Sequence, residues 1–592
     1  MPYAIRRQLS NDEQVKLAGF SPLLAHLLHH RGLTDSDTAQ KFLTPDYIRD
    51  THDPFLLKDA EKAAARIIQA IQNDERIAIY ADYDADGIPG AVIWSDFFKR
   101  IGFKNFSIYI PHRHDEGFGL NIAAVDHLAL HDAVELLITV DCGISDMKPV
   151  ERANELGMEV IITDHHEPPV SPSSGRESLP PAFAIIDHKQ TDCAYPDKNI
   201  CGSGVAFKLI QAILKKGKEA KKEKSKDEKI SLKEGHEKWF LDMVGLATLS
   251  DMVPLVGENR VFAYYGLQVL RKSPRKGLIR LLEKLKIAKQ HLTEDDIAFM
   301  VTPRINAASR MGLPMDAFSL LAADNDADAR KFADHLDAIN NERKGVVASL
   351  VKEVKKTLHG RHGQDAAAFP SVIVLGNPEW RPSLLGLVAN TCAGEFSRPV
   401  FLWGRDGDNA IKGSCRSEGR SNVVELMRAV PTGVLTQFGG HRYSGGFAVA
   451  NESVHFLEKH LTDAAEKVAN IPMVDEEIID AELSIDDIDW NLQKDINQLA
   501  PFGTGNPKPV FLFKKVSPIS VRRFGKGNEH IELTFKKSNS VKIPAISFFG
   551  IENEWAKKVE ANKPVDLVAS VEKSMFRGRA ELQLRVIDIH IP

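Results

Sequence analysis

Short apolar runs alternate with longer amphipathic segments between residues 56 and 165. Apolar runs of about four to eight residues are typical of buried strands, and apolar positions at helical spacing are typical of helices. This alternation predicts an α/β domain whose parallel sheet carries helices on both faces. Ligands bind at the carboxyl ends of the strands in such sheets. The expected strands are 77–80, 107–110, 136–140 and 159–163, and the expected helices are 59–72, 90–101, 122–130 and 150–156.

The rest of the chain divides into four further regions. The first predicts short helices because its leucines recur at helical spacing, and a proline-free stretch after the α/β domain predicts one long connecting helix. A second α/β pattern follows, and the last region holds short β-type runs that predict a small barrel of the OB type. The expected segments are an N-terminal helical segment (1–55), the first α/β domain (56–324), the connecting helix (325–360), the second α/β domain (361–470) and the β-barrel (471–592).

Two segments are expected to be surface insertions. Residues 168–181 are rich in Pro and Ser and predict a loop. Residues 215–237 form a Lys/Glu-rich run that interrupts a helical stretch. Such a run is typical of a solvated excursion, and contact with a nucleic acid is the alternative.

The composition excludes few functions. A net charge of −5 argues against a uniformly basic surface, but a local basic channel would still allow nucleic-acid binding. The five cysteines include no CxxC pair, which argues against a zinc site or a disulfide framework and favours a reducing cytoplasm. The sequence has neither the apolar core of a signal peptide nor a run of about 18 apolar residues, so no membrane association is expected.

Three acids at alternating positions follow the first expected strand. Asp82, Asp84 and Asp86 precede Gly87, which allows a sharp turn into the next helix. An extended chain would point all three side chains the same way, and like charges held together need a cation or a proton. A loop of caps and turns is the alternative, whereas the offsets do not fit the calcium loop of an EF-hand.

A second polar cluster makes a metal site the stronger interpretation. Asp141 ends one expected strand, Asp164, His165 and His166 end the next, and Asp251 follows an apolar helical run. Carboxylates mixed with imidazole suit Mn²⁺ or Mg²⁺ better than structural zinc, which favours thiolates. The ligands suffice for two ions, and a pair of ions can activate water and clamp the oxygens of a phosphoryl group.

At this point the chain resembles the RecJ nucleases of the DHH phosphoesterase superfamily. The resemblance covers about residues 80–570, and its motifs occur in the family's order. They are DYDADG, IPHRHDEGFGLN, TVDCGIS, TDHHEP, ATLSDMVPLVGENR and PRINAASRMG, then KGSCRS and FGGHRYSGG of the DHH-associated domain, and PFGTGNPKPVF at the start of the OB-fold.

The resemblance implies a role for each motif residue. The metal ligands would be Asp84, Asp86, Asp141, His165 and Asp251. Asp82 would ligate or support the ions, Asp164 would orient the histidines, and His166 would stabilise charge at the scissile phosphate, a buried structural histidine being the alternative. The implied substrate-binding residues are Arg113, Arg304, Asn306 and Arg310 in the first domain, and Ser414, Arg416, Ser417, Gly439, Gly440 and His441 in the second.

Each substrate-binding residue has a structural alternative. Guanidinium groups fit phosphate oxygens, but Arg113 or Arg310 could equally form a salt bridge. The glycines could let the backbone approach a phosphate in an anion-binding turn, or could form a plain tight turn. In the OB-fold, Phe502 and Phe524 could stack on bases, although core packing is the expected role of both.

The activity that the resemblance implies is 5′→3′ exonucleolytic hydrolysis of single-stranded DNA to mononucleotides by two metal ions, in DNA recombination and repair. The implied partners are single-strand-binding protein and a helicase, and a cytoplasmic monomer is expected. One alternative is a phosphodiesterase of short oligonucleotides or cyclic dinucleotides, against which the β-rich region speaks. Another is an inactive DNA-binding scaffold, against which the retained carboxylates speak.

The chain departs from the family pattern at a few positions. Pro89 stands where Thr or Ser is common, Asp187 and His188 replace an Asn-Pro pair, and Ser309 replaces Gly. Residues 380–383 read WRPS where the family has a Trp-His-x-Gly segment. None of these changes removes a proposed metal ligand. Several lie on the substrate side, so they bear on polarity, end preference and rate.

Overall fold

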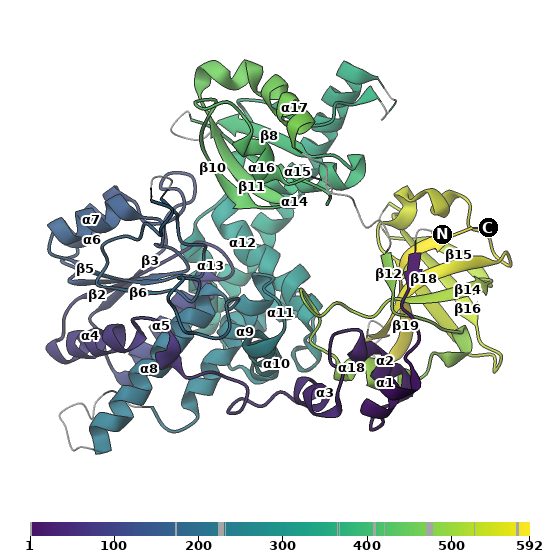
Figure 1. Ribbon diagram of the computed structural model, residues 1–592, viewed down its shortest axis with the longest axis horizontal. Helices are drawn as coiled ribbons and strands as arrows, with labels where there is room; N and C mark the ends of the chain where they lie inside the picture. Colours follow the sequence, from purple (N-terminus) through teal and green to yellow (C-terminus); the bar gives the residue numbers. More distant parts are fainter. Residues whose placement is uncertain are drawn as a thin grey trace. The chain divides into compact units, whose positions relative to one another are not determined.

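The computed structural model forms two compact units (Figure 1). The smaller unit contains residues 1–51, 254–264 and 474–592, and the larger contains 52–253 and 265–473. The predicted division into five segments is finer than these units and stays a prediction. The structure describes residues 3–171, 174–222, 230, 232–363, 365, 368–405, 410–419, 421–468, 477–525, 527–575 and 579–591.

The first sheet of the larger unit is parallel throughout, with strand order β3-β2-β4-β5-β6, as predicted. All residues of β2 and β4 are buried because α6 and α7 cover one face and α4, α5 and α8 the other (Figure 1). The strands are β2 (Ile77–Ala81), β3 (Phe106–Tyr109), β4 (Leu136–Val140), β5 (Glu159–Thr163) and β6 (Ala184–Ile186). The helices are α4 (Ala60–Asn73), α5 (Gly87–Ile101), α6 (Ile122–Leu130), α7 (Met147–Glu155) and α8 (Gly202–Lys222).

A run of helices follows, and its last member is the predicted long connecting helix. This helix, α14 (Asp326–His362), has 37 residues and begins where the Asn325 side chain accepts a hydrogen bond from the N–H of Asp328. Val354 and Leu358 near its end belong to the hydrophobic core of the second sheet. The preceding helices are α9 (Leu241–Ser250), α10 (Gly257–Lys272), α11 (Lys276–Lys284), α12 (Thr302–Met311) and α13 (Pro314–Leu321).

The second sheet has strand order β10-β11-β9-β8-β7, and only β7 and β8 pair in parallel. It confirms the predicted second α/β region. The strands are β7 (Ile373–Gly376), β8 (Val400–Arg405), β9 (Ile411–Arg416), β10 (Leu435–His441) and β11 (Ser444–Val449), and the helices are α15 (Pro382–Phe396), α16 (Val423–Arg428) and α17 (Leu457–Lys467).

The smaller unit joins the two ends of the chain. Helices α2 (Pro22–His29) and α3 (Ser36–Leu43), together with Leu17 directly after α1 (Asn11–Lys16), share one core with the C-terminal strands and α18 (Trp490–Gln498). The main sheet has the order β13-β14-β18-β19-β17-β16-β15, and a separate parallel pair joins β1 (Tyr3–Ile5) to β12 (Glu477–Ile479). The main strands are β13 (Ala481–Glu482), β14 (Phe511–Val516), β15 (Ser520–Phe524), β16 (His530–Lys536), β17 (Lys542–Ser547), β18 (Val565–Ser574) and β19 (Glu581–His590).

The two predicted insertions differ in how much of them is described. The loop at 168–181, described except at residues 172–173, contains one isolated bridge between Val170 and Glu177. In the Lys/Glu-rich segment 215–237, α8 continues to Lys222, and residues 223–229 and 231 lie outside the described residues. No helix in the described part of the chain has both the length and the apolar character needed to cross a membrane.

Candidate metal centre

Three aspartates follow β2 in a tight turn. Asp84 Oδ1 accepts hydrogen bonds from the backbone N–H groups of Asp86 (2.7 Å) and Gly87 (3.2 Å). A Cβ atom at Gly87 would lie 2.4 Å from the carbonyl oxygen of Asp82, so the turn requires glycine. The prediction that the acids continue the strand with their side chains aligned was therefore wrong, because the chain turns between Asp82 and Asp86, before α5 begins at Gly87.

Asp141 and Asp86 lie where β4 meets the start of α8. Asp141 directly follows β4 and has a φ of +64°, a strained conformation for a residue other than glycine. A Cβ atom on Gly202 would lie 2.7 Å from Asp141 Oδ1, so glycine lets α8 approach this carboxylate closely. The N–H groups of Gly202 and Ser203 donate to the two oxygens of Asp86 at 2.6 and 2.8 Å. The positive end of the helix dipole thus helps to hold a buried carboxylate.

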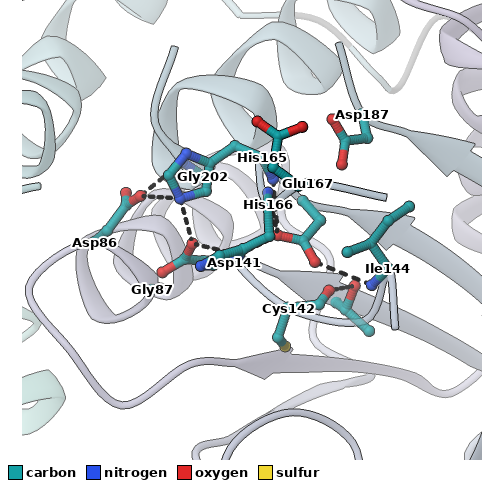
Figure 2. A network of polar contacts seen from close by, with 12 residues as sticks. Asp86, Gly87, Asp141, Cys142, Ile144, His165, His166, Glu167, Asp187 and Gly202 are labelled. Carbon is teal, nitrogen blue, oxygen red and sulfur yellow. Dashed lines mark hydrogen bonds and ion pairs between the residues drawn. The ribbon is translucent and has the colours of Figure 1, made fainter. Parts of the chain in front are cut away.

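The structure brings the predicted ligands together. His165 Nε2 lies 3.1 Å from Asp141 Oδ1 and 3.7 Å from Asp86 Oδ2, and Figure 2 shows the imidazole between these carboxylates. Its Nδ1 lies 3.8 Å from Asp251 Oδ2, at the end of α9. The side chains form three overlapping sets whose ligand atoms lie within 4.8 Å of one another, and Asp141 and His165 each belong to two of them. The sets are Asp82, Asp84 and Asp141; Asp86, His165 and Asp251; and Asp141, His165 and His166.

The electrostatics of these sets favours a cation. Burial, and then the neighbouring carboxylates, raise the pKa of Asp82, Asp141 and Asp251 well above the usual range and that of Asp86 to about 6. The Oδ1 atoms of Asp82 and Asp141 are buried and accept no hydrogen bond. Divalent cations would bind these oxygens and offset the repulsion. Carboxylates with one imidazole and no thiolate therefore fit Mn²⁺ or Mg²⁺.

The two adjacent histidines differ in charge. Asp164 Oδ1 accepts hydrogen bonds from His166 Nδ1 (2.7 Å) and from the backbone N–H of His165 (2.7 Å), and Asp164 Oδ2 accepts one from Ile144 N–H (3.0 Å). Burial and the charge of His166 lower the pKa of His165 to about 3, so its imidazole is neutral. Burial opposes a charge on His166, but Asp164 outweighs it and raises the pKa of His166 to about 9. His165 thus suits a metal, and His166 suits a negatively charged phosphate.

Arginines from distant parts of the chain gather in the larger unit. Arg113 lies over the Tyr83 ring at 4.8 Å from its centroid, and Arg310 Nη1 donates to the carbonyl oxygen of Ser383 at 2.7 Å. Burial, and then the charges of Arg113, Arg343 and Arg416, lower the pKa of Arg310 to about 9. We call these four the arginine cluster: Arg113, Arg310, Arg343 and Arg416. Half-buried positive charges that repel one another favour the binding of an anion.

Two predicted substrate residues have structural partners instead. The Arg304 guanidinium is buried, pairs with Asp337 of α14 at 2.9–3.0 Å, and donates to the Met300 carbonyl oxygen. Asn306 Oδ1 accepts a hydrogen bond from the N–H of Ala85 at 2.9 Å and so supports the acidic turn. The geometry therefore speaks against substrate contact by Arg304, and it gives Asn306 a positioning role.

The glycine-rich motif of the second domain is a strand, which corrects both of its predicted forms. Gly439 and Gly440 lie in β10 and pair with Gly446 and Gly445 of β11, so they form neither a tight turn nor an anion-binding turn. His441 pairs with Ser444, which pairs with Arg416 of β9. The predicted residues thus lie on β9 and β10, or directly after β9, and β11 separates these two strands. The structure brings Arg416 to the arginine cluster but leaves Gly439, Gly440 and His441 exposed.

Ser414 and Ser417 also lie near this region. Ser414 is on the same side of β9 as Arg416, and the backbone of Gly386 in α15 approaches both side chains. Ser417 Oγ accepts a hydrogen bond from Ser421 N–H at 3.2 Å, which shapes the loop after β9.

The family departures are accommodated locally. Pro89 lies in the first turn of α5, where a missing N–H costs little, and Ser309 Oγ donates to the Asn306 carbonyl oxygen at 3.3 Å. Asp187 and His188 are fully buried, and neither ring nitrogen of His188 has a hydrogen-bond partner. Ser383 contacts Arg310.

Sequence reasoning missed several residues around the site. Arg343 of α14 and Ser383 of α15 meet Arg310 only through tertiary packing, so no local pattern could reveal them. Gly202 and Ser203 lie in a CGSG segment that opens a helix, and this is a detectable signal for carboxylate binding.

Comparisons with known proteins agree with this geometry. Three family models match the chain: the DHH family N-terminal domain at residues 76–233, the DHHA1 domain at 369–471 and the RecJ OB domain at 479–588. The single-stranded-DNA-specific exonuclease RecJ of Bacillus subtilis is 32% identical, with 96% of this chain and 68% of the relative covered. That of Haemophilus influenzae is 30% identical, with 95% of each covered.

A solved structure shares the fold. The RecJ of Thermus thermophilus, crystallised in complex with Mn²⁺, matches with a TM-score of 0.78 at 24% identity, over 100% of this chain and 79% of that one. At this identity the match shows a common fold.

Proposed function

This chain belongs to the RecJ family of single-stranded-DNA-specific exonucleases, and we propose that it hydrolyses single-stranded DNA with two divalent metal ions. The observation that carries the proposal is the convergence of five carboxylates and the neutral imidazole of His165 from separate elements of one fold. The resemblance adds the 5′→3′ direction and the release of mononucleotides.

We propose the following division of labour at the site. Asp84, Asp86, Asp141, His165 and Asp251 would hold two Mn²⁺ or Mg²⁺ ions, with Asp82 as a further ligand or support. Bound there, the ions supply an activated water and neutralise charge on the phosphate oxygens.

The neighbouring residues orient the phosphate and donate to it. Asp164 holds the ring of His166 through the Nδ1 hydrogen bond, so the other ring nitrogen of a protonated His166 can donate to a phosphate oxygen. Arg113, Arg310 and Arg416 can bind further phosphate oxygens along the strand. Ser414 and Ser417 could add hydroxyl donors, and Gly439, Gly440 and His441 remain proposed contacts of the terminal nucleotide.

An aromatic and basic face of the smaller unit supports a single-stranded substrate. The rings of Phe524, Phe548 and Phe549 each contact His530, with centroids 4.7–5.2 Å apart. Arg585 lies over Phe548 at 4.2 Å, and Phe549 is 69% exposed. Exposed rings beside cations are typical of proteins that stack on successive bases. Phe502, in contrast, packs against the hydrophobic core.

The test follows the products from single strands labelled at either end, in Mn²⁺ or Mg²⁺. We expect mononucleotides, and we expect a blocked 5′ end to stop release while a blocked 3′ end does not. Faster hydrolysis of a dinucleotide than of a long strand would support the short-substrate phosphodiesterase instead. Binding without cleavage in either metal would support the inactive scaffold.

We further propose a cytoplasmic monomer that acts in recombination and repair beside single-strand-binding protein and a helicase. The support is the family resemblance. Sedimentation of the purified protein, alone and with single-strand-binding protein, tests the oligomeric state and the first of these partners.

A further inference from the structure

An exposed phenyl ring lies beside the proposed catalytic histidine. Phe118 is 55% exposed, and its ring centroid lies 5.5 Å from that of His166 and 6.4 Å from that of Tyr83. The two contacts have interplanar angles of 75° and 80°. Among the described residues, therefore, no ring stacks face to face on Phe118.

The loop that carries Phe118 is held firmly. Its neighbours Gly117 and Gly119 have φ of +83° and +79°, which disfavours any other residue there. The Tyr80 hydroxyl donates to the Gly119 carbonyl oxygen at 2.8 Å. A Cβ atom on Gly119 would lie 2.5 Å from an oxygen of the Asp146 carboxylate.

Asp146 fixes the next residue as well. Its Oδ2 accepts a hydrogen bond from the N–H of Leu120 at 2.7 Å. The backbone on the C-terminal side of Phe118 is thus anchored to β2 and to the turn before α7, while the phenyl ring projects into solvent. An apolar ring held rigidly in water next to a catalytic group suits a binding role. Its exposed surface makes no packing contact in the described part of the chain that would stabilise the fold, and such surface is typical of binding sites.

We propose that Phe118 stacks on the base of the nucleotide whose phosphate lies at the metal centre, an inference that rests on the proposed function. The ring contacts His166 on the one hand and, on the other, Tyr83, over which the guanidinium of Arg113 lies. A phenyl ring offers no hydrogen bond to a base edge, so it would hold any of the four bases. Phe118 would thus position the reacting nucleotide without sequence preference.

The test combines Phe118→Ala with an abasic substrate. Single strands carry one abasic site at the first, second or a remote nucleotide from the reacting end, and the full-length protein is assayed in Mn²⁺. We expect Phe118→Ala to lower kcat/KM on the intact strand roughly five- to 150-fold, the range for one base–aromatic stack. An abasic site at one of the first two positions should lower the wild-type rate equally, and the variant should lose nothing further on that strand.

Two variants control for structural damage. Phe118→Trp should restore stacking and most of the activity, and Phe456→Ala removes a ring of similar exposure (58%) without effect. Mn²⁺ affinity, measured by titration calorimetry, should be unchanged in Phe118→Ala. Equal losses on intact and abasic strands, or no loss at all, would overturn the inference.

A binding measurement separates this inference from the proposed activity. In EDTA, strands with 2-aminopurine at the first or second position report stacking through their fluorescence. A signal that Phe118→Ala abolishes and Phe118→Trp retains supports stacking even if the wild type cleaves no DNA, in which case only the proposed function fails. A signal that is the same in wild type and Phe118→Ala contradicts the inference whether or not the enzyme is active.

Discussion

Two groups of like charge differ in how the protein stabilises them: the arginine cluster and an acidic cluster, which consists of Asp82, Asp84, Asp86, Asp141 and Asp251. In the acidic cluster, backbone N–H groups from α8 and from the acidic turn bind several carboxylate oxygens, while the Oδ1 atoms of Asp82 and Asp141 accept no hydrogen bond. In the arginine cluster, Arg310 and Arg343 donate to neutral oxygens of Ser383 and Asn340.

The arginines of the arginine cluster differ from Arg304 and Arg275 in whether a carboxylate pairs with them. Within the part of the chain that the structure describes, none of the four cluster arginines forms an ion pair, whereas Arg304 and Arg275 pair closely with aspartates. Arginines with a carboxylate partner therefore stabilise the fold, and arginines without one are available to an anion. A phosphodiester bound with two divalent cations would offset like-charge repulsion in both clusters at once.

The largest effect is expected when the acidic cluster loses its shared ligand. Asp141→Asn should lower nuclease activity at least about 1000-fold, because several kcal/mol of metal-dependent stabilisation depend on the ions. The variant should be at least as stable as the wild type in EDTA, since a neutral amide removes repulsion. Cleavage rates and thermal unfolding measure the two effects. Glu151→Gln, on the exposed side of α7, is the control, and more than a tenth of the activity remaining in Asp141→Asn would refute the assignment.

Arg304→Ala sharpens the distinction between paired and unpaired arginines. Removing one partner of a buried ion pair leaves Asp337 uncompensated, so the free energy of unfolding should fall by about 3 kcal/mol. The activity of the remaining folded enzyme should be unchanged. Urea unfolding and single-turnover cleavage test this, with the exposed Arg330→Ala of α14 as the control. Weakened DNA binding with an unchanged free energy of unfolding would show that Arg304 binds the substrate, as the family resemblance implies.

The sequence predicts the acidic cluster well because its acids are identified by the apolar segments that precede them in the chain. Asp82, Asp141 and Asp164 each follow an apolar strand, and strand ends of a parallel sheet meet at one edge. What the pattern could not show is that Asp82 to Asp86 turn within the motif, because this depends on the contact between Gly87 and Asp82.

The arginine cluster was only partly predictable because its geometry is tertiary. Arg304 and Arg310 share α12 but lie six residues apart, so they point about 120° away from each other around the helix, and only Arg310 joins the cluster. Likewise, the leucines of α2 predict a buried face without identifying the β-rich core that covers it. An amphipathic pattern specifies that a face is buried, and the identity of its partner comes from the fold.

Arg416→Ala should weaken DNA binding without changing the affinity for the metal ions. We expect the Kd for a single strand to rise about 10- to 100-fold, as for the loss of a charge-assisted hydrogen bond, and the dependence of log Kd on log salt to become shallower. Mn²⁺ affinity should be unchanged, and Arg416→Lys should be intermediate because an ammonium cannot bind bidentately. Binding is measured by anisotropy across salt concentrations, with Arg428→Ala on α16 as the exposed control. A variant with unchanged DNA affinity would remove Arg416 from the binding surface.

The pH dependence of the free energy of unfolding tests whether Asp187 is coupled electrostatically to the acidic cluster. Burial, and then the charge of Asp164, raise the pKa of Asp187 to about 8. An acid with a raised pKa keeps its proton in the folded state after the unfolded chain has lost it, near pH 4, so stability falls as pH rises from about 4 to about 8. Asp187→Asn removes this contribution, and we expect the variant to be more stable than the wild type by up to about 5 kcal/mol at pH 8 and equally stable at pH 4.

Urea unfolding at several pH values, in EDTA and in Mn²⁺, decides between two situations. If Mn²⁺ abolishes the difference between Asp187→Asn and the wild type, Asp187 is coupled to the metal ligands and belongs with the acidic cluster. If the difference persists in Mn²⁺, Asp187 is an independent buried acid, and only the metal ligands depend on the charge of the ions. Asp324→Asn, an exposed acid, should follow the wild type throughout. Identical curves for Asp187→Asn and the wild type at every pH would show that burial does not hold the proton on Asp187.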